Sequence, residues 1–488
     1  MAKPAPMIDL RPVGYVIGLL VAVLGSTMLI PLAVDLWTGN DNWFVFLEGA
    51  ILTVLTGALL AMSSVSGMSG RLTLQQTFLM TTGVWLVLPI FGALPFYIGG
   101  PEMRAVDAFF EAMSGLTTTG STVIVGLDDM QPGVLVWRSM LQWFGGVGII
   151  VVAMVFLPEL RVGGMQIFRS ESFDTGGKVL PRAAQIAARI IVIYVGLTAV
   201  CHVCYVLVGM SPFDAFNHAM TTVATGGFST TDASFGAFPG AAEIVATVFM
   251  ILASLPFVRY VQILAGQPGA ILHDSQVRAF LVTFVIIVVM LVAFNLVANG
   301  ASFGIALRQV LFNGASILTG TGYASTDYQL WGAFPVTVFF LIGLIGGCAG
   351  STCCSIKVFR FQLLFASVRA QLQRIHSPHG VFTPHYEGRR VSDDVLSSVM
   401  AFFLMFVVSL GVLAVALSMT GLDFVTSISG AATALANIGP GLGDTIGPAG
   451  SFAPLNDTAK WLLSAAMLIG RLELLAVYAL LTVSFWRG

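Results

Sequence analysis

The chain has 488 residues, of which 57% are hydrophobic and 9% are charged. Soluble globular proteins carry about 25% charged residues, so most of this surface must face something other than water. The formal net charge of −2 gives no indication of nucleic acid binding, and the composition as a whole indicates a membrane protein.

Ten apolar segments are long enough to cross a bilayer as helices, which takes about 20 residues for about 30 Å of hydrocarbon. The first follows a short stretch with two basic residues and is too long for a secretory signal, so we expect it to be retained. In chain order the predicted spans are 13–37, 44–66, 72–99, 133–158, 185–210, 241–266, 278–299, 334–371, 395–420 and 458–486.

Four shorter apolar stretches lie between the later spans and are too short to cross: 105–119, 213–226, 306–321 and 424–438. Each ends in sequence rich in small residues, as expected for a re-entrant helix that stops inside the membrane. The four align on one glycine each, with a small hydroxyl residue six positions earlier. The glycines are Gly120, Gly227, Gly322 and Gly439, and the hydroxyl residues are Ser114, Thr221, Ser316 and Thr433.

The aligned glycines are separated by 107, 95 and 117 residues, which leaves room for two spans and their loops in each interval. Internal repetition of this kind indicates architecture. We predict an all-α polytopic membrane protein with ten transmembrane helices and four re-entrant pore helices, in helix–pore loop–helix repeats with fourfold pseudosymmetry. Two leading helices occupy 1–70, and the repeats occupy 71–160, 161–267, 268–375 and 376–488.

The distribution of charge predicts the orientation. With a cytoplasmic amino terminus, 17 of the 22 Lys and Arg residues fall on the cytoplasmic side and four on the outer side, as the positive-inside rule requires. Both termini are then cytoplasmic. The outer side carries 15 carboxylates, of which Asp232, Asp327 and Asp444 lie close to the aligned loops and could raise the local concentration of cations.

The four loops that contain the aligned glycines are the main candidate site. Backbone outside a helix is tolerated at membrane depth only where it is buried in protein or lines a wet cavity. Four such loops could place carbonyl oxygens around one axis and replace the water shell of a cation, with the carbonyl ends of the short helices aimed at that axis. The alternative is that the glycines only allow close helix packing.

The loop sequences TTTGS (117–121), ATGGFST (224–230), TGTGYAS (319–325) and ANIGPGLGD (436–444) resemble the Trk/Ktr/HKT superfamily of potassium transporters, most closely its bacterial TrkH branch. The resemblance covers nearly the full length, including the two leading spans. It implies a selectivity filter that binds K⁺, and the glycine in every loop implies a preference for K⁺ over Na⁺. The implied filter residues are Thr118, Thr119, Gly120, Thr225, Gly226, Gly227, Gly320, Thr321, Gly322, Asn437, Ile438 and Gly439, with Thr117, Ala224, Thr319 and Ala436 at its inner end.

A glycine-rich stretch inside the predicted span 334–371 should break the helix. It resembles the intramembrane loop that acts as a gate beneath the filter in this superfamily. The superfamily pattern reads GGCAGSTGGGIK, whereas Cys353, Cys354 and Ser355 replace three glycines here. The implied gate residues are Gly346, Gly347, Cys348, Ala349, Gly350, Ser351, Thr352 and Cys353, together with Arg471.

Arg471 is a charged residue inside the last predicted span. Eleven residues separate it from Lys460 at the outer edge, which places it about 16 Å deep. A charge at that depth normally faces a wet pathway or a partner, although it could instead bond to carbonyls of a neighbouring helix. The motif GRLE (470–473) matches the superfamily and implies an arginine that projects into the pore below the filter and slows permeation.

The resemblance also implies partners. It predicts a homodimer in the bacterial inner membrane, regulated by a TrkA-like cytosolic nucleotide-binding subunit. No cofactor is expected apart from bound K⁺, because the chain has no nucleotide-binding fingerprint of its own. The cytoplasmic stretches 159–189 and 357–394 are rich in basic residues and histidine and could contact anionic lipid or that subunit.

Three other functions remain as alternatives. The same architecture could carry sodium, or both sodium and potassium. A secondary transporter with broken helices usually shows paired inverted halves, whereas these four loops share one orientation. An enzyme is not expected, since the chain shows no Ser/His/Asp set, metal-ligand spacing or paired intramembrane acids.

Overall fold

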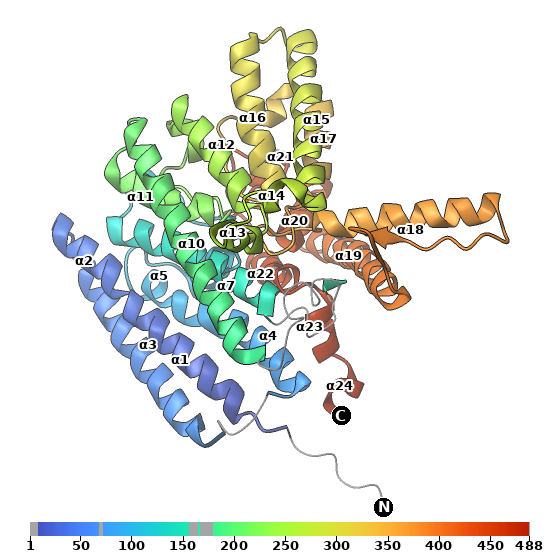
Figure 1. Ribbon diagram of the computed structural model, residues 1–488. Helices are drawn as coiled ribbons and strands as arrows, with labels where there is room; N and C mark the ends of the chain where they lie inside the picture. Colours follow the sequence, from blue (N-terminus) through green and yellow to red (C-terminus); the bar gives the residue numbers. More distant parts are fainter. Residues whose placement is uncertain (1–7, 68–71, 156–163, 166–178, 488) are drawn as a thin grey trace, which may run out of the picture.

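The computed structural model describes residues 8–67, 72–155, 164–165 and 179–487. These residues form a bundle of helices from which one long helix projects sideways (Figure 1). The only strands in the described ranges are β1 (His385–Tyr386) and β2 (Arg389–Arg390), a short antiparallel pair.

Two leading spans lie at one edge of the bundle, the first made of two consecutive helices (Figure 1). The chain forms α1 (Arg11–Thr27), α2 (Leu29–Thr38) and then α3 (Trp43–Ser64). Small residues let α1 and α3 pack backbone to backbone, because a Cβ on Gly18 would lie 2.7 Å from the carbonyl oxygen of Gly57. This is the close contact that small residues favour between helices in membranes.

The rest of the chain repeats one arrangement four times: a long helix, a short helix that stops at a loop, and a second long or broken helix. The first repeat holds α4 (Leu74–Gly92), α5 (Leu94–Ile98), α6 (Ala105–Leu116) and α7 (Pro132–Val155). The second holds α10 (Val179–Leu207), α11 (Pro212–Val223), α12 (Ala241–Ala253) and α13 (Phe257–Leu264). The third holds α14 (Ala270–His273), α15 (Ser275–Ala298), α16 (Phe303–Thr319), α17 (Ala333–Gly343) and α18 (Val358–His376). The fourth holds α19 (Asp393–Ser418), α20 (Phe424–Ala436), α21 (Gly443–Ile446), α22 (Asp457–Arg471), α23 (Leu475–Leu480) and α24 (Val483–Arg487).

The number of continuous spans is smaller than the ten predicted. Within the described residues, seven helices are long and apolar enough to cross a membrane, and an eighth span counts if α12 and α13 are taken together. That pair bends by 87° at residues 254–256, a break that the apolar pattern of 241–266 did not predict. The predicted spans 334–371 and 458–486 are also interrupted, since α17 ends at Gly343 and α22 at Arg471.

The backbone shows why the last two spans break. In the predicted span 334–371, Gly346 and Gly350 have φ of +27° and +74°, which an L-residue in a helix does not adopt. After α22, Glu473 and Leu474 have φ of +63° and +37°. The break at the glycine-rich stretch was predicted from sequence, whereas the break after Arg471 was not.

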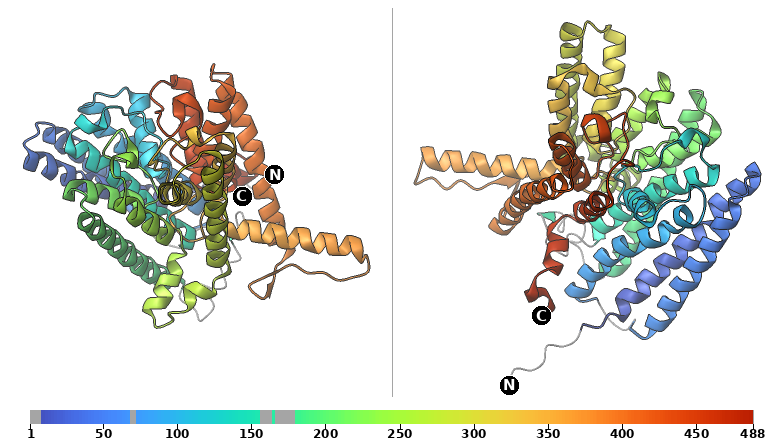
Figure 2. Two further views of the ribbon diagram at one scale, coloured as in Figure 1. Left: turned by 90° about the horizontal axis from the view of Figure 1, so that it is seen from above. Right: turned by 180° about the vertical axis from the view of Figure 1, so that it is seen from behind.

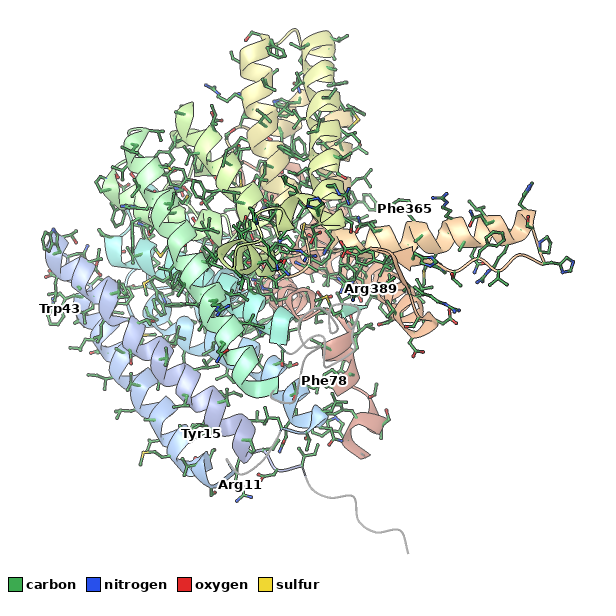
Figure 3. All side chains as sticks on the ribbon, in the orientation of Figure 1. Arg11, Tyr15, Trp43, Phe78, Phe365 and Arg389 are labelled. Carbon is green, nitrogen blue, oxygen red and sulfur yellow. The ribbon has the colours of Figure 1, made fainter. Side chains whose placement is uncertain are left out.

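Helix α18 leaves the bundle instead of continuing the direction of α17, and it projects in every view (Figures 1 and 2). Its side chains include Phe365, which is 67% exposed and is labelled in Figure 3. Arg369 and Arg374 on the same helix are exposed too. The chain turns at the loop between α17 and α18, where the glycine-rich stretch was predicted to break the span 334–371, but the departure of α18 from the bundle was not predicted.

Candidate ion-conduction site

All four short helices end in the same left-handed turn. The residue two positions before each aligned glycine has a positive φ: +51° at Thr118, +51° at Thr225, +76° at Gly320 and +52° at Asn437. Glycine is the usual residue at such a helix end, and a β-branched threonine there is strained. The two threonines at this position therefore indicate a conformation imposed by the surroundings, whereas asparagine, like glycine, adopts it readily.

The aligned hydroxyl residues take part in this turn through their backbone. The carbonyl of Ser114 accepts from the N–H of Thr119 at 2.9 Å, which closes the helix end as in a Schellman motif. The carbonyls of Thr221 and Thr433 accept equivalent bonds at 2.9 Å, whereas the carbonyl of Ser316 accepts from the N–H one residue further on, at Gly322, at 3.2 Å. The sequence register of these residues thus corresponds to a repeated backbone structure.

The four aligned glycines form a closed ring in which each loop contacts the next. A Cβ on Gly120 would overlap the carbonyl oxygen of Gly226 in the second loop, and one on Gly227 would overlap that of Thr321 in the third. A Cβ on Gly322 would lie 2.6 Å from the backbone nitrogen of Gly439 in the fourth loop, and one on Gly439 would lie 3.1 Å from the carbonyl oxygen of Gly120. The fourth loop thus returns to the first.

The fourth loop differs from the other three at its glycine. Gly120, Gly227 and Gly322 have φ of +86°, +79° and +84°, whereas Gly439 does not have a positive φ. Only the first three positions therefore require glycine for their backbone conformation. The sequence alignment did not distinguish this fourth position from the others.

Several carbonyl oxygens of the ring loops accept no hydrogen bond from residues within the described ranges. In the part of the chain that the structure describes, no hydrogen bond is donated to the carbonyls of Thr119, Gly120, Thr321 or Gly322. Their neighbours are held by buried hydroxyl pairs, with Thr117 and Thr319 bonded at 2.7 Å to the hydroxyls of Thr119 and Thr321. Buried carbonyls normally have partners, so this arrangement suits a cation that exchanges water for backbone oxygen.

A cavity of about 540 Å³ opens on one side of the ring, and Gly120, Gly227 and Gly439 line it. Of the three acids predicted to lie near the loops, Asp232 and Asp444 line the cavity. Asp232 also accepts hydrogen bonds from two backbone N–H groups of the first loop, at Gly126 and Leu127. Asp327 instead caps a short turn by accepting from the N–H of Gln329.

The loop between α17 and α18 lies against the opposite side of the ring. Thr352 accepts a hydrogen bond from the hydroxyl of Thr225 at 3.1 Å, and the N–H of Ser355 donates to the carbonyl of Ala436 at 3.1 Å. The thiol of Cys354 lies 3.8 Å from the hydroxyl of Thr118. The predicted gate segment thus contacts the second loop through Thr352, and the two residues that follow it, Cys354 and Ser355, contact the first and fourth loops.

The same segment is hydrogen-bonded to the break between α12 and α13. The N–H groups of Cys348 and Thr352 donate to the carbonyls of Ser254 and Ala253 at 3.1 and 3.3 Å, and the N–H of Phe257 donates to the carbonyl of Gly350 at 2.9 Å. Backbone groups that leave a helix at membrane depth need partners. Here the break between α12 and α13 and the loop between α17 and α18 serve as hydrogen-bond partners for each other.

Arg471 lies buried next to the loop between α17 and α18. It is 2% exposed, donates to the carbonyl of Gly145 at 3.1 Å and contacts the thiol of Cys354. Beside it lies a cavity of only about 20 Å³, lined in part by Cys354, Lys357 and Glu473, which leaves room for about one water molecule. Glu473 does not pair with Arg471 but with Arg360.

Sequence reasoning missed three residues of this inner region. Cys354 directly follows the predicted gate segment and was left out of it, although it contacts both Arg471 and the first loop. Lys357 and Arg360 were assigned to the cytoplasmic surface, yet they are 7% and 0% exposed. The sequence did carry a signal for their burial, because both residues follow a glycine-rich stretch within an apolar segment.

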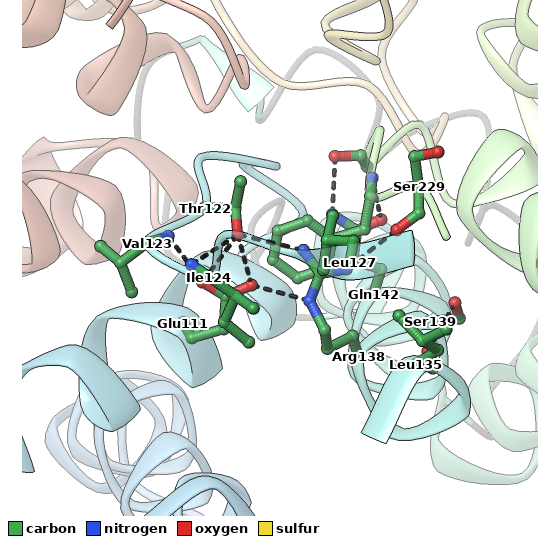
Figure 4. A network of polar contacts seen from close by, with 12 residues as sticks. Glu111, Thr122, Val123, Ile124, Leu127, Leu135, Arg138, Ser139, Gln142 and Ser229 are labelled. Carbon is green, nitrogen blue, oxygen red and sulfur yellow. Dashed lines mark hydrogen bonds and ion pairs between the residues drawn. The ribbon is translucent and has the colours of Figure 1, made fainter. Parts of the chain in front are cut away.

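A buried ion pair contacts the segments that follow the ring glycines of the first and second loops (Figure 4). Arg138 of α7 and Glu111 of α6 are 1% and 0% exposed, and their charged groups are 2.8 Å apart. Glu111 also accepts from the N–H of Val123 at 2.9 Å, and Arg138 donates to the carbonyl of Ser229 at 2.9 Å. Each charge therefore has backbone partners as well as the opposite charge.

Replacing Glu111 with alanine is expected to lower the free energy of unfolding by about 3–5 kcal/mol, because the buried guanidinium of Arg138 would lose its counter-charge. The measurement is the thermal unfolding midpoint of the purified protein in detergent. Asp129→Ala, which removes an exposed carboxylate of the same loop, is the control and should leave the midpoint unchanged. Equal midpoints for the two variants would contradict a structural role for the pair.

The family of the chain follows from comparison with known proteins. The family model for TrkH, described as cation transport protein, matches residues 43–485. The chain belongs to the TrkH family of cation transport proteins.

Relatives and a solved structure agree over nearly the whole length. The Trk system potassium uptake protein TrkI of Halomonas elongata is 43% identical over 98% of this chain and 97% of its own. TrkH of Escherichia coli K12, with the same description, is 36% identical over 98% of this chain and 99% of its own. The crystal structure of the potassium transporter TrkH from Vibrio parahaemolyticus superposes with a TM-score of 0.91 at 35% identity, covering 98% of this chain and all of the other.

These comparisons confirm two predictions from the sequence. The superfamily resemblance and the all-α membrane fold both stand. The relatives are named as uptake proteins, which agrees with the prediction of a transporter and not an enzyme. The boundaries of the repeats and the roles of individual site residues remain predictions.

Proposed function

We propose that the chain conducts potassium ions across the bacterial inner membrane through the ring of four loops. The observation that carries this proposal is the closed ring itself, with carbonyls of its first and third loops that accept no hydrogen bond from the described residues. The twelve predicted filter residues would bind K⁺, with Thr117, Ala224, Thr319 and Ala436 at the inner end. The relatives' printed function, potassium uptake, supports the choice of ion.

We favour potassium over sodium because each loop has glycine at the ring position, so that no side chain crowds the backbone atoms of the next loop. The convergence of all four short helices on one ring supports a channel over a secondary transporter, whose sites lie between inverted halves. The test is ion flux in liposomes that contain the purified protein, with K⁺ and Na⁺ gradients in turn. Flux with sodium equal to or above that with potassium would favour the alternative function.

We place both termini in the cytoplasm, with the 540 Å³ cavity facing outward. The support is the excess of basic residues on one side of the predicted topology and the two acids that line this cavity. A negative entrance attracts cations. Several of the basic residues that support this orientation, among them Arg161 and Arg169, lie outside the described residues.

The gate in this proposal is the segment Gly346–Cys353 together with Arg471. The support is the contact of Thr352 with the second loop and the contacts of the next residues, Cys354 and Ser355, with the first and fourth loops, where the pathway would leave the filter. A cavity of about 20 Å³ next to it is too small for an ion with its water shell. The structure therefore corresponds to a closed pathway in this proposal.

Deleting residues 348–353 should produce a leak of potassium from loaded liposomes, because the deletion removes the backbone that closes the inner side. Size-exclusion chromatography establishes that the variant remains monodisperse. Deleting six residues from the exposed connection after α18, 378–383, is the matched control and should not leak. A monodisperse deletion variant that stays tightly closed would rule out a gate at this position.

Regulation would come from a TrkA-like cytosolic subunit that binds nucleotide, and the chain would act as a homodimer in contact with membrane lipid. The word system in the relatives' names supports a multi-component transporter. The exposed basic residues of α18 and of β2 could contact such a subunit or anionic lipid. Most of the other predicted contact stretch, 159–189, lies outside the described residues.

A further inference from the structure

Gln142 of α7 is a fully buried side chain that bonds to two backbone groups of the second loop. Its amide nitrogen donates to the carbonyl of Gly226 at 2.6 Å, and its amide oxygen accepts from the N–H of Phe228 at 3.0 Å. A Cβ on Gly226 would overlap this amide. The two bonds enclose the ring glycine Gly227, and Figure 4 shows Gln142 on the same helix as Arg138.

The same face of α7 follows the second loop from its outer to its inner end. One turn before Gln142, Arg138 donates to the carbonyl of Ser229 at 2.9 Å. One turn after it, a Cβ on Gly146 would lie 3.0 Å from the Cα of Ala224. Positions four apart lie on one face of a helix. A helix of the first repeat therefore supports the loop of the second along its length.

This support is not repeated around the ring. Gly226 aligns with Thr119, Thr321 and Ile438 of the other loops, each one position before the ring glycine. Throughout the described residues, the carbonyls of those three accept no hydrogen bond, whereas that of Gly226 is held by Gln142. The second loop thus has an oxygen whose position depends on a side chain behind the ring.

We propose that Gln142 is a positioning residue for ion selectivity, acting through the carbonyl of Gly226 and not by touching the ion. The proposal rests on the function proposed above, in which the ring is a filter. Filter oxygens favour one ion over another through their number, orientation and freedom to move. Without the amide N–H, the Gly226 carbonyl could move toward a smaller ion, and the preference for K⁺ over Na⁺ would fall.

Two substitutions separate this role from a role in folding. Gln142→Leu adds no charge and removes both the donor to Gly226 and the acceptor for the N–H of Phe228. Gln142→Met keeps the length and suits an apolar site. The control is Ser139→Ala on the same helix, because the hydroxyl of Ser139 donates only to the carbonyl of Leu135 within α7, at 3.0 Å.

The measurement is the ratio of K⁺ to Na⁺ permeability of the purified full chain in liposomes, which reports only on molecules that conduct. We expect the ratio to fall about fivefold in both Gln142 variants, as for the loss of the hydrogen bond to Gly226, and to stay at the wild-type value in Ser139→Ala. A wild-type ratio in a conducting Gln142 variant would overturn the proposal. Loss of all conduction in both variants would also overturn it, because a positioning residue leaves a working pore.

Gly120→Ser, made in parallel, separates failure of this inference from failure of the proposed function. If Gly120→Ser changes the ratio and the Gln142 variants do not, the ring is a filter and Gln142 does not position it. If the wild-type protein shows no preference for K⁺ and Gly120→Ser has no effect, the proposed function fails, and the role of Gln142 fails with it.

Discussion

Replacing Arg471 with alanine is expected to raise potassium flux by roughly an order of magnitude. The guanidinium is buried directly behind the inner ends of the loops, where it contacts Cys354 and the carbonyl of Gly145. At about 8 Å and an effective dielectric constant of about 20, two unit charges repel by about 2 kcal/mol. A barrier lowered by that amount corresponds to a rate about thirtyfold higher, and the lost contacts would offset part of the gain.

The flux of ⁸⁶Rb⁺ or K⁺ into liposomes measures this effect. Arg471→Lys keeps the positive charge and should keep the flux low, whereas Arg471→Gln should resemble the alanine variant. If Arg471 only holds neighbouring helices together, the alanine variant would lose stability without any rise in flux per folded molecule. That outcome would show that Arg471 is not part of the permeation barrier.

Replacing Gly120 with serine is expected to lower the preference for K⁺ over Na⁺ about tenfold. Gly120 has a φ of +86°, and a Cβ there would overlap the carbonyl oxygen of Gly226. Such a conformation costs about 1–3 kcal/mol for a residue other than glycine, and the overlap must displace the second loop. The permeability ratio from reversal potentials in mixed ions measures the loss.

Gly439→Ser is the matched comparison within the same ring. Gly439 lacks a positive φ, and a Cβ there would lie 3.1 Å from the carbonyl oxygen of Gly120, so a small shift accommodates it. The serine should therefore cost less selectivity at Gly439 than at Gly120. Equal losses at the two positions would show that the backbone conformation of the first loop is not the cause.

The sequence predicted the repeated loops and the break at the gate segment because both depend on local signals. Glycines in register with hydroxyl residues marked the ring, and a run of small residues marked the break before α18. Two other breaks escaped prediction. Residues 254–256 and 472–474 lie within apolar segments of the usual length. The first break is hydrogen-bonded to Cys348 and Thr352, and Glu473 in the second pairs with Arg360, all far away in the chain.

The hydrogen bonds by which a helix of one repeat supports the loop of another could not be predicted from the sequence either. Gln142 and Arg138 are a polar pair inside a predicted span, and nothing local indicates that they face the loop of the next repeat. Glu111, counted among the outer carboxylates, is 0% exposed and pairs with Arg138. Contacts of this kind depend on how the repeats assemble, which spacing within one repeat does not determine.

The hydrogen bonds between the gate segment and the α12–α13 break restrict how the pathway could open. Moving Cys348, Gly350 and Thr352 alone would break three hydrogen bonds and leave three carbonyls and three N–H groups without these partners, each at a cost of several kcal/mol away from water. A displacement shared by both segments keeps all three bonds. Opening should therefore be concerted, with the short helix α13 and the gate segment moving as one unit. A displacement of either one would then displace the other.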